Sequence, residues 1–264
     1  MTHSTETPIE SALLVGLSIP GIPTWEAEDS LDELARLTDT ATITVVERVL
    51  QVRKRIDPAF YIGKGKAHEL KELAKQMSVD MIIFDNDLSP AQMRNLEELC
   101  ETRVLDRSAI ILDIFSQHAR TRTAQVQVEL AQLNYLFPRL THQWTHLSRQ
   151  QGGGAIRGMG AAGVRGPGET QLETDRRLLR ARIKSIQARL QRVRNQREQS
   201  RRARRRAELP ILSLVGYTNA GKSTLFNRVT ASQVYAADKL FATLDPTLAR
   251  VDIEQFGPVL FADT

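Results

Sequence analysis

The sequence lacks three features that mark special classes of protein: paired cysteines, long apolar runs and a targeting segment at its start. Cys100 is its single cysteine among 264 residues, which excludes a disulfide-stapled miniprotein and fits a reducing cytosol. No run approaches the roughly 18 apolar residues that span a bilayer. The first ten residues, MTHSTETPIE, are polar and acidic rather than typical of a signal or transit peptide. With 41% apolar and 25% charged residues, we expect a soluble cytoplasmic protein with no stable membrane association.

Charge is distributed unevenly along the chain. The net charge is +5, yet residues 176–206 hold 14 lysines and arginines against one acid, Glu198, so the other 233 residues sum to −8. Like charges at this density repel one another along a helix, and a polyanion is the natural partner. Because few aromatic residues lie nearby, we expect recognition of the shape and backbone of folded RNA. A basic coiled-coil arm that binds an acidic protein is the alternative.

Residues 1–106 alternate apolar runs with amphipathic stretches. The amphipathic stretches show helical spacing, as in Leu70, Leu73, Ala74 and Met77, and Ser89-Pro90 is typical of a helix start. Strands that alternate with helices through short connections predict a small parallel α/β sheet. We expect strands over residues 12–17, 41–46, 79–84 and 104–105, and helices over residues 25–37, 66–77 and 91–100.

Residues 107–208 predict a long antiparallel helical hairpin, because apolar residues recur there at spacings of three and four. Thr170 and Glu173 match a capping box at the start of the second helix. Residues 152–168 hold eight of the fifteen glycines. We expect a glycine-rich loop there, which is either a plain linker or, through Arg157 and Arg165, an RNA contact. The two predicted seams are Val126, Leu130, Leu133, Phe137 and Leu140, and Leu172, Leu179, Ile183, Ile186, Leu190 and Val193.

Residues 209–264 open with an apolar run, a glycine-containing loop and a helical run, and strands are expected over 249–253 and 258–262. The loop, GYTNAGKS, matches the P-loop pattern G-x-x-x-x-G-K-[ST] in the strand–helix context that its mechanism requires. The backbone N–H groups of such a loop face phosphates, the lysine reaches the β- and γ-phosphates, and the serine holds Mg²⁺. The predicted nucleoside triphosphate site consists of Gly216, Thr218, Asn219, Ala220, Gly221, Lys222, Ser223 and Thr224.

Two further residues stand at suitable distances from the P-loop. Thr243, about twenty residues beyond it, is a candidate Mg²⁺ ligand in the presence of a γ-phosphate, with Asp245 and Thr247 as rivals. Asp263 ends an apolar strand and is a candidate to hold Mg²⁺ through water. The predicted metal site therefore comprises Ser223, Thr243 and Asp263, and no certain catalytic residue is apparent.

Other candidate sites are weaker. Residues 63–66, Gly-Lys-Gly-Lys, resemble a phosphate loop but lack its full spacing. We expect a turn and a helix start there, with a second nucleotide site as the alternative. His142 and His146 are four residues apart, yet no third ligand is evident and no cysteine pair supports zinc. We therefore predict no metal besides Mg²⁺.

Several longer strings carry a family resemblance. The P-loop, LFATLDPT (240–247) and the strand that ends in Asp-Thr resemble the first three nucleotide motifs of translation-factor-type GTPases in the Obg–HflX group. YIGKGKAHEL (61–70), FDNDLSPAQMRNLEE (84–98) and GPGETQLETDRR (166–177) closely resemble the HflX family. This resemblance implies an α/β N-terminal domain (1–106), a long-helix subdomain (107–208) and a Ras-like P-loop GTPase domain (209–264) that these residues do not complete.

The resemblance also implies a function. A protein of this family is expected to be a GTPase that uses GTP and Mg²⁺, binds the large ribosomal subunit and its rRNA, and helps to dissociate or rescue stalled ribosomes. We expect it to be a monomer. The glycine of DxxG and the guanine-reading N-K-x-D motif are not among these 264 residues, so guanine specificity follows from the resemblance alone and this chain by itself is expected to be inactive. The expected RNA contacts are Arg157, Arg165, Arg201, Arg202, Arg204 and Arg205.

Two alternative functions stay open at this point. One is a nucleotide-dependent RNA remodeller in which the helical arm performs the work. The other is a non-catalytic RNA-binding module that keeps the basic arm. Affinity for guanine against adenine nucleotides separates the first alternative from a GTPase, and nucleotide binding by the chain itself separates the second.

Overall fold

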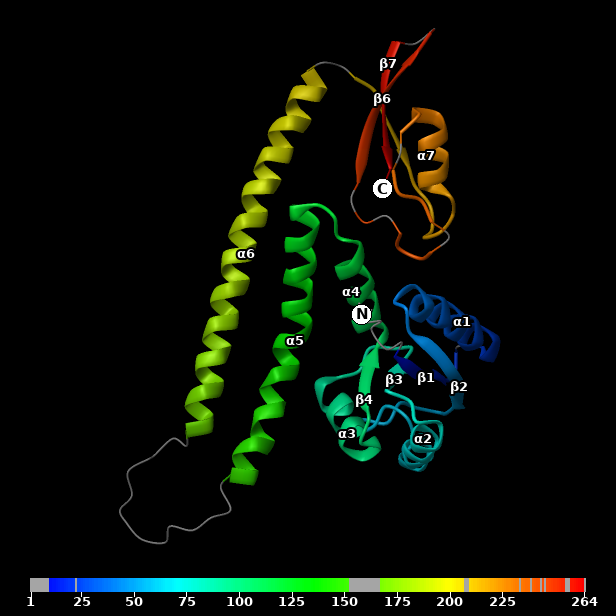
Figure 1. Ribbon diagram of the computed structural model, residues 1–264, viewed down its shortest axis with the longest axis vertical. Helices are drawn as coiled ribbons and strands as arrows, with labels where there is room; N and C mark the ends of the chain where they lie inside the picture. The colour runs from blue at the N-terminus through cyan, green and yellow to red at the C-terminus, as the bar shows by residue number, and fades with distance from the viewer. Residues whose placement is uncertain are drawn as a thin grey trace, which may run out of the picture. The chain divides into compact units, whose positions relative to one another are not determined.

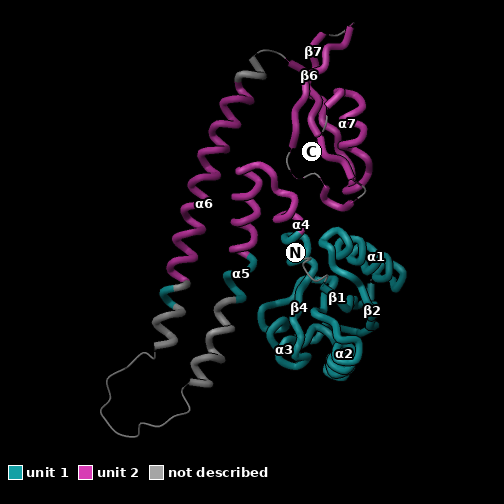
Figure 2. The backbone as a smooth tube through the Cα atoms, in the orientation of Figure 1, with its two compact units in different colours: residues 1–113, 135–174 teal, residues 114–134, 175–264 magenta. Residues whose placement is uncertain are grey.

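The computed structural model describes residues 10–21, 23–151, 167–206, 209–232, 234–237, 239–242, 244, 246–254 and 257–263, and only the backbone of residues 140–151, 167–172, 175 and 203–206. The chain forms two compact units (Figure 2). Unit 1 comprises Met1–Asp113 and Tyr135–Thr174, and unit 2 comprises Ile114–Asn134 and Asp175–Thr264. Among the described helices, none combines the length and apolarity that crossing a bilayer requires. The three-domain division at residues 106 and 208 stays a prediction.

Unit 1 contains a four-stranded sheet in the order β2-β1-β3-β4, and all its strand pairs are parallel (Figure 1). This confirms the predicted parallel α/β sheet. Because crossover connections are right-handed, an order that reverses direction after β2 places α1 on one face and α2 and α3 on the other. The strands are β1 (Ser11–Ser18), β2 (Thr44–Val52), β3 (Met81–Phe84) and β4 (Arg103–Asp106), and the helices are α1 (Thr24–Thr40), α2 (Lys64–Met77), α3 (Pro90–Cys100) and the first part of α4 (Arg107–His118), which continues into unit 2.

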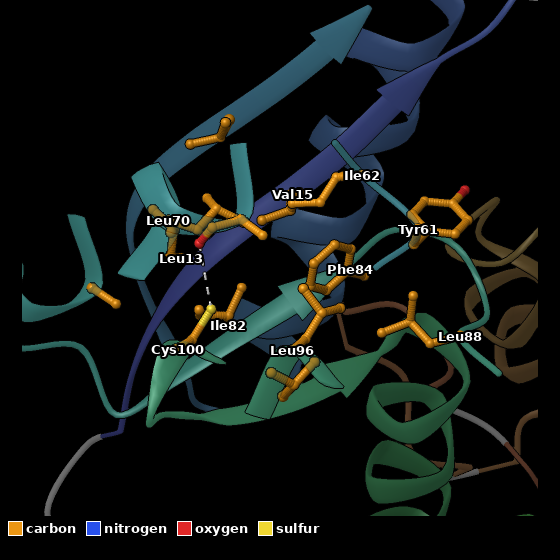
Figure 3. Packing of buried hydrophobic residues seen from close by; sticks show 14 of the residues in the cluster. Leu13, Val15, Tyr61, Ile62, Leu70, Ile82, Phe84, Leu88, Leu96 and Cys100 are labelled. Atoms are coloured by element: carbon orange, nitrogen blue, oxygen red, sulfur yellow. Dashed lines mark hydrogen bonds between the residues drawn. The ribbon is translucent and has the colours of Figure 1, made fainter. Parts of the chain in front are cut away.

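The core of unit 1 lies on the central strands β1 and β3 (Figure 3). Leu13, Ile82 and Phe84 are fully buried, as expected for parallel strands that are covered on both faces. Tyr61 packs the edge of its ring on Phe84, with 6.1 Å between ring centroids. Cys100 is also buried here, and its thiol donates to the carbonyl oxygen of Ala67 at 3.7 Å.

Two element boundaries differ clearly from the prediction, those of β2 and of the start of α6. β2 begins at Thr44 and runs to Val52, later than the expected residues 41–46, because this edge strand is largely exposed and lacks a continuous apolar run. α6 begins at Pro167, so Thr170 lies inside the helix and is not its N-cap, and the predicted loop 152–168 was two residues too long. The helix start at Ser89 is confirmed, since its hydroxyl accepts from the N–H of Gln92 at 3.2 Å in a capping box.

The parts of α5 (Arg122–Gln151) and α6 (Pro167–Arg206) that belong to unit 2 pack antiparallel. Glu129 accepts from Arg182 at 2.5 Å, whereas Val126, earlier in α5, shares a groove with Leu190 and Val193, later in α6. The predicted seams are therefore confirmed where side chains are described, with Val126 and Ile186 buried. Leu140 and Leu172 are described by their backbone alone.

A second sheet in unit 2 has the strand order β5-β7-β6. β5 and β7 are parallel, and β6 is antiparallel to β7. The carboxyl ends of β5 and β7 therefore share one edge of the sheet with the start of β6. Helix α7 packs on this sheet with Phe226 fully buried. The elements are β5 (Ile211–Leu214), α7 (Lys222–Thr230), β6 (Thr247–Ile253) and β7 (Gly257–Asp263).

Candidate functional site

The loop between β5 and α7 is wound as a tight turn (Figure 1). The N–H of Ala220 donates to the carbonyl oxygen of Tyr217 at 3.3 Å, and Asn219 and Gly221 have positive φ values of 60° and 80°. Glycine suits the second of these positions because it tolerates left-handed backbone. Gly221 is also the N-cap of α7 and offers no side-chain hydrogen bond to the first helical amides. The start of α7 is also the positive end of the helix dipole, which favours an anion there.

The ammonium group of Lys222 lies over this loop. Its Nζ donates to the carbonyl oxygens of Gly216 and Tyr217 at 2.9 Å and 2.8 Å. The side chain starts at the first residue of α7 and folds back toward the end of β5. The lysine is therefore placed beside the same turn whose amides open toward the pocket.

A pocket of about 260 Å³ opens at this turn. All eight residues predicted for the nucleotide site line it, so the fold brings the predicted group together. Its other wall comes from the segment between α7 and β6, which sequence reasoning had identified only through Thr243. Thr243 itself lies outside the described residues. The residues of this second wall are Ala236, Ala237, Lys239, Phe241 and Ala242.

Two polar side chains near the pocket lack hydrogen-bond partners among the described residues. The hydroxyl of Thr218, in the pocket lining, is buried and unpaired, and so are both carboxylate oxygens of Asp263. Asp263 is fully buried and does not itself line the pocket. Its backbone pairs with Leu214 on one side and Thr247 on the other, which places it at the strand edge from which the P-loop starts. Buried polar atoms without partners are rare and often mark a ligand or ion position.

The oxygen atoms at this edge are of the kind that Mg²⁺ prefers. Ser223 contributes a hydroxyl in the pocket lining, and Asp263 contributes an unpaired carboxylate. Mg²⁺ binds through one or two such groups together with water and phosphate oxygens. The described residues contain no group of three or more His, Cys, Asp or Glu side chains placed to hold a metal by themselves. The donors present therefore fit Mg²⁺ that arrives with a phosphate ligand.

The carboxyl edge of the sheet in unit 1 is the other place where a ligand would be expected, because ligands bind where the strand order reverses. Here the protein's own side chains fill it. Arg107 forms ion pairs with Asp85 at 2.9 Å and Glu33 at 2.6 Å, and Arg139 forms one with buried Asp106. Burial, with the charges of Asp85 and Asp87, raises the pKa of nearby Tyr61 to about 12. These ion pairs join side chains of the protein to one another, although the buried Nε of Arg139 has no hydrogen-bond partner among the described residues.

The Gly-Lys-Gly-Lys sequence of residues 63–66 forms a helix start. Gly63 is the N-cap of α2, and the ammonium of Lys66 pairs with Glu69 at 2.6 Å. The amide of Gly63 donates to the side chain of Gln51 at 3.0 Å. The backbone therefore has the turn and helix start expected from the sequence.

Of the six arginines expected to contact RNA, four belong to α6. Arg201 and Arg202 are exposed, and Arg202 lies 3.5 Å from Glu198. Arg204 and Arg205 belong to the same helix with only their backbone described, and Arg157 and Arg165 lie outside the described residues. The end of α6 thus presents at least two exposed arginines on a 40-residue helix.

Three family models match successive parts of the chain. They are described as GTP-binding GTPase N-terminal over residues 28–116, GTP-binding GTPase Middle Region over residues 118–204, and 50S ribosome-binding GTPase over residues 211–264. A crystal structure of a complex of SsGBP with GDP is similar with a TM-score of 0.52 and 22% identity, over 96% of this chain and 61% of that one. This similarity supports the fold.

Curated relatives are similar across most of the chain. GTPase HflX of Escherichia coli strain K12 is 55% identical over 236 residues, which are 89% of this chain and 54% of the relative. GTPase HflX of Alkalihalophilus pseudofirmus is 45% identical over 264 residues, all of this chain and 60% of the relative. The chain thus spans little more than half the length of these relatives. With three family models in sequence and this degree of identity, the chain belongs to the HflX family.

Proposed function

We propose that the protein is a GTPase whose P-loop pocket binds GTP together with Mg²⁺. The observation that carries the proposal is the turn at Gly221, which brings the start of α7 and the Lys222 ammonium to one pocket. Amides at a helix start and a lysine are complementary to the β- and γ-phosphates of a nucleotide. The names of the relatives favour guanine as the base and hydrolysis as the reaction. We assign hydrolysis to a protein of the relatives' full length.

We propose that Ser223 and Asp263 hold the Mg²⁺, Ser223 directly and Asp263 through water. The unpaired buried carboxylate of Asp263 supports this role, because a cation would satisfy it. Held there, the ion would neutralise negative charge on the β- and γ-phosphates while the γ-phosphoryl group is transferred to water. Thr243 is the proposed third ligand, since it lies in the same segment as pocket residues Phe241 and Ala242.

We further propose that the large ribosomal subunit and its rRNA are the partners, and that the protein promotes the dissociation or rescue of stalled ribosomes. The match to a family model described as a 50S ribosome-binding GTPase supports the first part. The 14 positive charges of residues 176–206 support RNA as the contacted surface. A cytoplasmic monomer suits this role. A GTP-dependent change in the segment around Thr243 would couple the pocket to the ribosome.

Fluorescence titration with an N-methylanthraniloyl derivative of GTP (mant-GTP) and Mg²⁺ tests the nucleotide site. Lys222→Ala removes a charge-assisted contact and should weaken binding by about 2–3 kcal/mol, or about 30- to 150-fold. The matched control is Lys75→Ala, which removes an exposed lysine of α2 and should leave affinity unchanged. Equal affinities of the unaltered chain and Lys222→Ala would refute the assignment of the pocket.

An RNA remodeller or a non-catalytic RNA-binding module is the second candidate, favoured by the long arginine-rich helix α6. Competition of unlabelled GTP and ATP against mant-GTP bound to a protein of the relatives' full length separates a GTPase from a remodeller. From a GTPase, GTP should displace mant-GTP far more readily than ATP does. Equal competition would favour the remodeller, and RNA binding without any nucleotide affinity would favour the module.

A further inference from the structure

The segment of residues 235–244 contacts two parts of unit 2. On one side it forms the second wall of the P-loop pocket, through Lys239 and Phe241 among others. On its other side it contacts the end of α4 and the start of α5, residues 115–128, which we call the α4–α5 corner. The wall of the pocket and the long helix α5 therefore meet through one short stretch of chain.

Three side chains of the segment contact the α4–α5 corner. Phe241 presents a T-shaped contact to Phe115, with ring centroids 5.1 Å apart and planes at 88°. Tyr235 receives the guanidinium of Arg120 over its ring at 4.5 Å. Leu244 packs against a buried cluster in the corner formed by Ala119, Ala124 and Val128.

The corner is fixed by its own hydrogen bonds. The hydroxyl of Thr121 accepts from the N–H of Ala124 at 3.1 Å, which caps the start of α5. The side-chain amide of Gln125 donates to the carbonyl oxygen of Ala119 at 3.2 Å. The N–H of Ala119 in turn donates to the carbonyl oxygen of Phe115 at 2.9 Å. The ring of Phe115 thus projects from a part of the chain with little local freedom.

Phe241 needs such support because its backbone is in an unfavourable region. Its φ is 53°, a left-handed conformation that is uncommon for residues other than glycine and costly for bulky ones. Such a conformation persists where surrounding contacts compensate for its cost. The half-buried ring of Phe115 supplies an aromatic contact of this kind.

We propose that Phe115 is a positioning residue for the nucleotide pocket. It acts through Phe241, holding residues 239–242 against the P-loop so that the second wall is in place before a nucleotide binds. This inference rests on the proposed nucleotide-binding function. A pocket wall that is ordered before binding reduces the conformational entropy lost when a nucleotide binds. A variant whose wall is disordered should therefore release its nucleotide faster.

The test uses stopped-flow dissociation of mant-GTP and mant-GDP from the whole chain. Phe115→Ala should raise the dissociation rate by about two- to tenfold, the range expected for an aromatic pair, and Phe115→Tyr, which keeps the ring edge, should restore it. The control Trp25→Ala removes a 62% exposed aromatic residue of unit 1 and should change nothing. Unchanged dissociation from a folded Phe115→Ala chain would overturn the proposal.

Two further measurements guard against simple misfolding. Phe115→Leu and Phe241→Leu keep apolar volume, and their effects on dissociation should be less than additive because they remove the same contact. Additive effects on the dissociation rate would argue against a shared contact between Phe115 and Phe241. Hydrogen exchange should also show faster exchange at residues 239–242 in Phe115→Ala, with β7 unchanged. If no mant-nucleotide binds the unaltered chain, the proposed function fails, and unchanged exchange at residues 239–242 would overturn the positioning role separately.

Discussion

Arg139 of α5 donates through Nη2 to the carboxylate of Asp106 at the end of β4, across 2.9 Å. Asp106 is fully buried, and Tyr135, one helical turn before Arg139, donates its hydroxyl to the other carboxylate oxygen at 2.8 Å. Burial, followed by the charge of Asp106, raises the pKa of Tyr135. The two donors fasten this part of α5 to the sheet of unit 1.

Replacing Arg139 by alanine should strongly destabilise unit 1. The variant leaves Asp106 buried with its charge uncompensated, and losing one partner of a buried pair costs about 3–5 kcal/mol. Cys100 reports on this unit directly, since burial raises the pKa of its thiol to about 11 and shields it from reagents. Thiol labelling along a urea series should therefore shift to lower urea concentrations in Arg139→Ala.

Arg94→Ala is the control for this variant. Arg94 lies 3.8 Å from Glu98 on the surface of α3 in an i,i+4 pair, and exposed pairs contribute about 0–1 kcal/mol. Its labelling curve should lie close to that of the unaltered chain. Similar shifts for both variants would mean that the buried Arg139–Asp106 pair stabilises the fold no more than an exposed ion pair does.

Asp57 should make stability depend on pH in the acid range. Backbone N–H groups of Ala59 and Phe60 donate to its carboxylate at 2.9 Å and 3.1 Å, and these bonds, with Arg53, hold its pKa below the usual 3.8. A carboxyl with a lowered folded pKa stabilises fully above its unfolded pKa and loses that contribution as pH falls through the folded value.

Asp57→Asn should therefore be less stable than the unaltered chain at pH 7, and the two stability curves should converge below the folded pKa. Urea denaturation between pH 2 and pH 7, followed by circular dichroism, measures the difference. A constant difference over the whole range would contradict the role given to the charge.

Asp263→Asn should have opposite effects on stability and on ligand binding. Its carboxylate is fully buried and unpaired among the described residues, so neutralising it removes an uncompensated charge and should raise or preserve the melting temperature without ligand. The same change should weaken the Mg²⁺-dependent part of mant-GTP binding. Thermal melts and titrations with and without Mg²⁺ would show both, and an equal loss of affinity in EDTA would exclude the proposed metal role.

The basic helix α6 should bind rRNA electrostatically and with little sequence preference. Neutralising six phosphates would lower affinity about a thousandfold between 50 and 200 mM salt. Reversing Arg201, Arg202, Arg204 and Arg205 to Glu should weaken binding uniformly and flatten the salt dependence, while the helical circular dichroism signal stays the same. Salt-insensitive affinity, or full retention after the reversals, would assign the arm to a protein partner.

Much of the fold is readable from periodicity. The central strands β1 and β3 are continuous apolar runs because both their faces are covered, and the seams of α5 and α6 repeat at three and four residues. β2 was harder, since this edge strand exposes residues such as Val46 and Val52 and its pattern merges with the following loop. The start of α6 was misplaced because a capping pattern also occurs inside helices.

The P-loop part of the candidate site could be predicted from the sequence because one local motif forms it. The P-loop needs a strand, a turn and a helix that are consecutive in sequence, so its eight residues could be named together. Lys239 and Phe241 could not be assigned as a pocket wall, because their place in the pocket lining is a tertiary feature, and the ring that contacts Phe241 belongs to Phe115, more than 120 residues earlier in the chain. The ion pair between Arg139 and Asp106 could not be predicted either, because it joins α5 to the end of β4 and is a tertiary contact.

The two hydrogen bonds from Lys222 to the carbonyls of Gly216 and Tyr217 use two of the three N–H bonds of its ammonium. The loop's own backbone thus holds the charged end of the side chain in place, and one donor is left for an anion. A phosphate oxygen that accepts from this third N–H would gain a charge-assisted hydrogen bond without breaking the other two. The lysine is therefore preorganised, and little of its side-chain entropy is left to be lost when a ligand binds.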